Sequence, residues 1–161
     1  TKGRHDDMKL KMNNQVGLTI CVVTLLVLCT LSIGQPMMFD RQKKQREREV
    51  SARMEKIWKA EQDFRKQNNV YTANLQQLIK AGLLADSLQF IPYSQGKRFK
   101  VTANIDITRS GRQVPSLTIV AQYDDYLWDM NENSVANLIE EANKRGSYPG
   151  LKMSNAEDSN P

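Results

Sequence analysis

A run of 18 uncharged residues, from Val16 to Ile33, constrains this chain more than any other feature of its sequence. As an α-helix the run would extend roughly 27 Å, close to the roughly 30 Å thickness of a bilayer's hydrocarbon core. We therefore expect a transmembrane helix over residues 16–39, ended or kinked near Pro36. A cleaved secretory signal is the alternative, because Ser32-Ile33-Gly34 resembles a small-residue cleavage site, and a secreted binding module would then follow.

The composition excludes most familiar enzyme chemistry. The chain has one histidine, His5, and its two cysteines, Cys21 and Cys29, both lie inside the apolar run. These residues do not supply a His/Cys zinc set, a Ser/His/Asp triad or a cysteine nucleophile in water. We expect a non-enzymatic protein that uses no cofactor.

Basic residues flank the apolar run on both sides, and the net charge of the chain is +5. Residues 1–15 form a predicted basic N-terminal head, and a second basic cluster covers residues 41–48. The second cluster is the larger, which favours a cytoplasmic C-terminal part, although this rule weakens for long translocated domains. Glutamates alternate with the basic residues and no aromatic residue lies among them, so nucleic acid is a poor candidate for the partner.

The sequence after the membrane segment predicts an α+β fold. Residues 40–69 show apolar residues at helical spacing without Gly or Pro, which indicates a long amphipathic stalk helix. A short helix is expected over residues 75–84. Strict alternation then predicts a strand over residues 99–107, with a loop over 109–115 and a returning strand over 117–123. We expect this small antiparallel sheet to pack on the stalk.

The C-terminal part predicts one more helix, over residues 134–144, with Gly146 as its C-cap. Residues 70–152 are therefore expected to form a small α+β head domain. The polar residues 153–161 predict a disordered tail.

A weak calcium-loop pattern begins where the returning strand ends. Asp129, Asn131, Asn133 and Glu140 hold the first, third, fifth and twelfth positions, where oxygen ligands are required. Ser134 stands where such a loop needs glycine, and helix capping explains the same polar residues without a metal.

Two interaction surfaces are candidates. An assembly interface would combine small residues of the membrane helix with apolar residues of the stalk: Gly17, Thr24, Ser32, Val50, Met54, Ile57 and Phe64. A partner patch would use Tyr126 and Trp128, which lie on one face if the returning strand continues through them.

The order of parts resembles that of type IV pilins and the pseudopilins of secretion systems. Residues 60–78, AEQDFRKQNNVYTANLQQL, are similar to their stalk-to-head junction, in which an aromatic residue, a polar turn, a tyrosine and a Leu-x-x-Leu helix follow one another. The chain is also similar to uncharacterised bacterial single-pass membrane proteins that share this junction and finish with Tyr-Pro-Gly-Leu-Lys, here residues 148–152.

This resemblance implies a structural subunit of a pilin-like, secretion or other bacterial envelope assembly, with its C-terminal domain in the periplasm. Its partners would be other envelope or membrane proteins, itself and the lipid bilayer. The prepilin cleavage motif is absent around residues 14–18, which lack the expected Phe and Glu. The rival interpretation is an accessory subunit of a membrane enzyme or transporter.

Overall fold

The computed structural model describes residues 14–107 and 111–155, with the backbone alone at Asn14 and at residues 31–36. The chain divides into two compact units, Thr1–Asp40 and Arg41–Pro161. The basic head predicted over residues 1–15 lies almost wholly outside the described residues. Most of the predicted tail, the start of the predicted loop and the side chain of Ser32 lie outside them as well.

A single helix, α1 (Asn14–Asn68), begins in the first unit and ends in the second. It continues through Pro36, so the helix does not end there as the sequence analysis allowed. In the first unit the side chains from Gln15 to Thr30 are exposed except at Gly17, and none of them is charged. Among the side chains that the structure describes, no helical stretch meets the length and hydropathy needed to cross a membrane.

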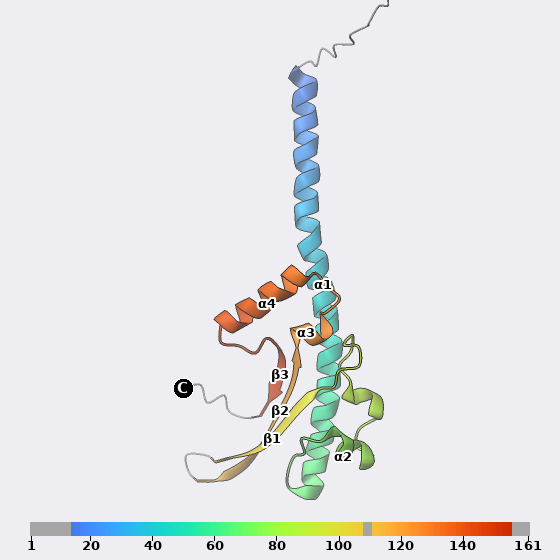
Figure 1. The fold of residues 1–161 in the computed structure, drawn as a ribbon, viewed down its shortest axis with the longest axis vertical. Helices are drawn as coiled ribbons and strands as arrows, with labels where there is room; N and C mark the ends of the chain where they lie inside the picture. The colour runs from blue at the N-terminus through green and yellow to red at the C-terminus, as the bar shows by residue number, and fades with distance from the viewer. Residues whose placement is uncertain (1–13, 108–110, 156–161) are drawn as a thin grey trace, which may run out of the picture. The chain divides into compact units, whose positions relative to one another are not determined.

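The second unit is α+β, as predicted. After α1 its elements are α2 (Leu75–Lys80), the 3-10 helix η1 (Asp86–Gln89), β1 (Lys100–Ile107), β2 (Gln113–Gln122), α3 (Tyr123–Tyr126), α4 (Glu132–Lys144) and β3 (Gly150–Ser154). Figure 1 shows the sheet and α2 beside the part of α1 that belongs to this unit.

The three strands form an antiparallel sheet in the order β1-β2-β3. Ala103 of β1 lies opposite Leu117 of β2, while Ile119 lies between Val101 and Met153. The backbone carbonyl of Leu117 accepts a hydrogen bond from the Asn155 N–H on the β3 side, at 3.2 Å. The central strand is thus paired on both edges, and β1 forms one edge of the sheet.

The apolar stripe of α1 and the inner face of the sheet make one core. Val50, Met54 and Ile57 are almost fully buried, and so are Leu117 and Ile119 of the central strand. The stripe forms because apolar residues three or four positions apart share one helix face. Burial of such side chains contributes about 1.5–3 kcal/mol each.

Two C-terminal predictions were wrong. Residues 123–126 form α3 in place of the end of a strand, because the Gln122 side chain and the Asp125 carboxylate make a capping box there. Residues 150–154 form β3, although the sequence analysis ended the ordered head at residue 152 without a strand. Gly150 permits this strand, because a Cβ at that position would lie 2.2 Å from the carbonyl oxygen of Ala121.

Candidate functional site

The predicted assembly interface is divided by the fold. Val50, Met54 and Ile57 lie in the core of the second unit, so they are not available to another subunit and this part of the prediction was wrong. The stripe that could have paired two stalks packs instead on the sheet of the same chain. Phe64 of the second unit is half-buried. Gly17 and Thr24 belong to the first unit.

The predicted partner patch is divided as well. Tyr126 is fully buried, while the Trp128 side chain is 51 % exposed. A shared strand face required an extended backbone, and the turn of α3 points the two rings in different directions. Trp128 donates its indole N–H to the Tyr93 carbonyl at 2.6 Å, so the exposed indole is held in one orientation.

An arginine on α1 organises the surface around Trp128. Arg46 donates hydrogen bonds from Nη1 and Nη2 to the Asp129 carboxylate, with 2.9 Å between Nη2 and Oδ2, and Nη1 also donates to the Tyr126 carbonyl at 2.8 Å. Its guanidinium lies 4.6 Å from the centroid of the Tyr93 ring. These four residues and Trp128 form what we call the Arg46 cluster. Sequence analysis missed it, because Arg46 lies 83 residues from Asp129.

The electrostatics of the Arg46 cluster favour fixed charges. The hydrogen bond with Arg46 lowers the pKa of Asp129 and raises that of Arg46. A hydrogen bond to Glu49 raises the pKa of the Tyr93 hydroxyl. Each shift favours the charge state that the group already has near neutral pH, so Arg46 stays cationic, Asp129 anionic and Tyr93 neutral there.

A buried carboxyl group lies near the other end of α1. Glu61 is fully buried, and its Oε2 accepts the backbone N–H of Thr72 at 2.9 Å. Its Oε1 has no hydrogen-bond partner among the described residues. Burial raises the pKa of Glu61 to about 7. The signal was present in the sequence as a glutamate within the apolar stripe, but only the fold shows that no cation of the described residues pairs with it.

The calcium-loop residues do not assemble into an ion site. Asp129 pairs with Arg46, while the Asn131 side chain accepts the Ser134 N–H at 3.0 Å and caps α4. Glu140 pairs with Lys144 on the exposed side of the same helix. Across the described residues no group of three or more His, Cys, Asp or Glu side chains converges on one point. Capping therefore accounts for the polar run, Asn133 being an exposed residue of α4.

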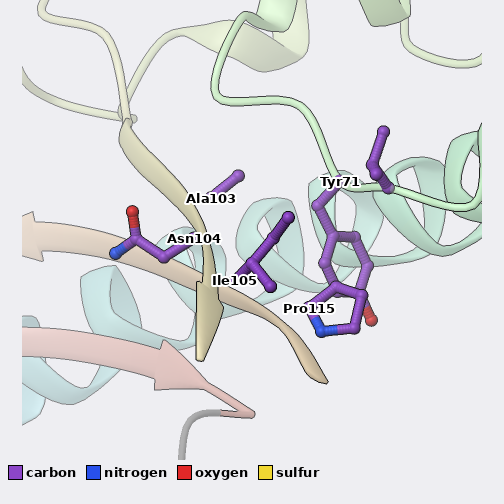
Figure 2. Close-up of a pocket in the computed structure, with 6 residues that line it drawn as sticks. Tyr71, Ala103, Asn104, Ile105 and Pro115 are labelled. Carbon is purple, nitrogen blue, oxygen red and sulfur yellow. The ribbon is translucent and has the colours of Figure 1, made fainter. Parts of the chain in front are cut away.

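A shallow apolar groove lies where β1 approaches the turn after α1. Its volume is about 380 Å³, and its lining residues are Val70, Tyr71, Ala103, Asn104, Ile105 and Pro115. Figure 2 shows the Tyr71 ring beside Pro115 and close to Ile105. Ile105 in the groove is 57 % exposed, and beyond the groove the same face of β1 continues with Ile107, which is 72 % exposed.

Comparison of the chain with protein-family models, with curated proteins and with solved structures finds no match. The site residues must therefore be interpreted from their geometry alone.

Proposed function

We propose that this chain is a membrane-anchored, non-enzymatic structural subunit of a bacterial envelope assembly of the pilin-like or secretion-related kind. One observation carries the proposal: a single helix, α1, begins in a segment with exposed apolar side chains and ends in the core of a folded α+β unit.

The first unit needs an apolar surrounding. Nine large apolar side chains of this unit are 49 % to 70 % exposed: those of Val16, Leu18, Ile20, Val22, Val23, Leu25, Leu26, Val27 and Leu28. Soluble monomers rarely expose an apolar surface as continuous as this. In the sequence the uncharged run extends to Ile33, and in lipid the bilayer would cover it.

Three threonine hydroxyls of the first unit are bonded in a way that suits a lipid environment. The hydroxyls of Thr19 and Thr24 each donate to the carbonyl four residues earlier, both at 2.8 Å, and Thr30 donates to Val27 at 2.9 Å. A hydroxyl satisfied within its own helix does not oppose burial in hydrocarbon. Gly17 and Thr24 are small, and small residues let membrane helices approach one another closely.

The location proposed for the chain is the bacterial inner membrane, with one pass and the α+β unit in the periplasm. The resemblance to pilins and pseudopilins supports this orientation. The proposed partners are other envelope or membrane proteins, further copies of the chain and the bilayer, and nucleic acid is not among them.

An accessory role in a membrane enzyme or transporter is the second candidate, and the exposed indole of Trp128 favours it. A large aromatic side chain held in one orientation is typical of a contact with a different protein.

Gentle detergent extraction of the tagged full chain, followed by native mass measurement, tests the proposal. We expect a series of complexes that contain several copies of this chain. A fixed stoichiometric set of unrelated membrane proteins would replace the structural role with the accessory one. Recovery of the chain in the soluble fraction would contradict both roles.

A further inference from the structure

The outer edge of β1 is the longest open strand edge in the described part of the chain. In the sheet order β1-β2-β3 this edge faces away from β2, and β3 at the opposite side has only five residues. An open edge presents N–H and C=O groups that can pair with another strand. The question is which strand this edge fits.

Two hydrogen bonds of Leu117 show which residues of β1 direct their backbone N–H and C=O groups toward the open edge. Both backbone groups of Leu117 bond toward Asn155 on the β3 side, so in β2 the residues alternating with Leu117 bond toward β1. Their partners in β1 are the even-numbered residues, such as Thr102 opposite Thr118. The backbone groups of Val101, Ala103 and Ile105 therefore point to the open edge.

The edge has a defined beginning. The N–H of Phe99 donates to the Gln89 carbonyl at 3.0 Å, so the segment before β1 already occupies the edge up to that residue. From Val101 onward the described residues outside the sheet offer no hydrogen bond to the backbone of β1. The free stretch thus starts at Val101 and includes the exposed Ile105 and Ile107.

The side chains of β1 are complementary to a second copy of the same strand. If two β1 strands pair antiparallel about a two-fold axis at Ala103, residues 101 to 105 of each copy form the ladder, which ends before the edge position that Gln89 occupies beside Phe99. Lys100 of each copy then lies opposite Asp106 of the other at the end of that ladder. Both side chains are exposed on the outer face of the sheet, and neither forms an ion pair within the described residues. The symmetry makes this opposite-charge pair twice, which favours the arrangement.

The same register is consistent on the inner face. Val101 lies opposite Ile105 of the second copy, and each such pair exchanges both N–H···O bonds, because these residues point to the open edge. The side chains that enter the apolar groove beside Tyr71 are then the small Val101 and Ala103 of the second copy, which suits its shallow form (Figure 2).

We propose that β1 is a homotypic docking edge, through which two copies of this chain join their sheets antiparallel about Ala103. The inference goes beyond the structural role proposed above and does not require the membrane anchor, because every residue involved belongs to the second unit. One strand pair is small beside the roughly 1,000 Å² of a stable interface. The contact is therefore reversible, and a covalent trap is the suitable probe.

Disulfide trapping of the full chain in detergent micelles tests the pairing. With Cys21 and Cys29 replaced by serine, Ala103→Cys places two thiols on residues whose Cα atoms are about 5.5 Å apart in the pair. Under a mild oxidant we expect at least fivefold more disulfide dimer than for Ile107→Cys. The two copies of position 107 lie eight residues apart along the paired strands, so Ile107→Cys is the matched control.

The control is strict because Ile107 is more exposed than Ala103, so random collision would favour the control variant. Equal or greater dimer yield for Ile107→Cys would overturn the proposal. Membrane binding is measured separately, so a failure here leaves the proposed anchor intact, and a failure of the anchor leaves the trapping result intact.

Charge reversal tests the register. In the Ala103→Cys background we expect Lys100→Glu or Asp106→Lys alone to lower the dimer yield severalfold. The double change Lys100→Glu with Asp106→Lys restores it, because the opposite charges still meet. Glu55→Lys on the exposed face of α1 alters the net charge as much as Asp106→Lys and should leave the yield unchanged. Failure of the double change to restore the yield would contradict pairing about Ala103.

Discussion

At the residue scale the most consequential group is the buried Glu61. Its pKa of about 7 means that between about pH 4.5 and pH 7 the folded chain holds a proton which the unfolded chain has released. The only hydrogen bond to the carboxyl group in the described structure comes from the Thr72 N–H, and the other oxygen is unpartnered there. The buried charge therefore opposes folding once the group ionises.

A Glu61→Gln variant should remove this penalty. Because the folded-state pKa is raised, stability is highest below pH 4.5 and falls as the pH rises toward 7. We expect the stability advantage of the variant over the parent chain to grow by roughly 2.5 kcal/mol when the pH is raised from 5 to 8. Urea unfolding of both proteins at the two pH values measures the gain. A constant difference between them would show that Glu61 is solvated or paired.

Arg46 offers a second prediction at this scale. Its planar guanidinium contacts the Asp129 carboxylate, the Tyr126 carbonyl and the Tyr93 ring together, which an ammonium group does not reproduce. We expect Arg46→Lys to destabilise the second unit by about 1–2 kcal/mol. The control is Lys66→Arg, because in the described structure Lys66 makes an exposed ion pair with Asp63 alone and should tolerate the change within about 0.5 kcal/mol. Equal unfolding midpoints for Arg46→Lys and the parent chain would contradict the contacts described for the Arg46 cluster.

At the scale of elements, α1, α4 and the two hairpin strands were predicted at the right places in the sequence, whereas α3 and the strand β3 were missed. Periodicity predicted the amphipathic half of α1 and the alternating strand β1, because both depend on local spacing. The strand β3 was missed, because five residues give too little alternation and its pairing with β2 depends on contacts with residues distant in sequence. The sequence correctly indicated that Val50, Met54 and Ile57 form an apolar stripe. It allowed the stripe to pack either on the sheet or on the stalk of another copy, and the structure packs it on the sheet.

The close approach of β3 to β2 can be tested at Gly150. A Cβ there would lie 2.2 Å from the Ala121 carbonyl oxygen, so Gly150→Ala must displace the backbone of the central strand. We expect a loss of roughly 3 kcal/mol. Gly146→Ala is the matched control. The φ of Gly146 is also positive, at +67°, but no atom lies within 4 Å of a Cβ added there. This variant should lose only about 1 kcal/mol. Similar losses for both variants, measured by urea unfolding, would contradict the tight β2–β3 contact.

At the scale of the whole molecule, the two units differ in how they place their apolar side chains. The first unit exposes apolar side chains along the described part of its helix, whereas the second buries its apolar side chains in a core of its own. Sequence alone predicted this contrast, because it depends on composition and charge. Sequence did not predict which apolar residues remain for assembly, because that depends on how the second unit folds. Of the predicted interface, Gly17, Thr24 and the half-buried Phe64 remain candidates, the side chain of Ser32 lies outside the described residues, and the edge of β1 is a new candidate.

The central claim is that the apolar half of α1 anchors the folded unit in a bilayer. Flotation of the purified full chain with lipid vesicles through a density gradient, after a wash at alkaline pH, tests it most directly. We predict that the chain floats with the vesicles, and that Val23→Arg with Leu26→Arg remains at the bottom with its second unit still folded. A parent chain that remains at the bottom with the second unit folded would contradict the membrane anchor.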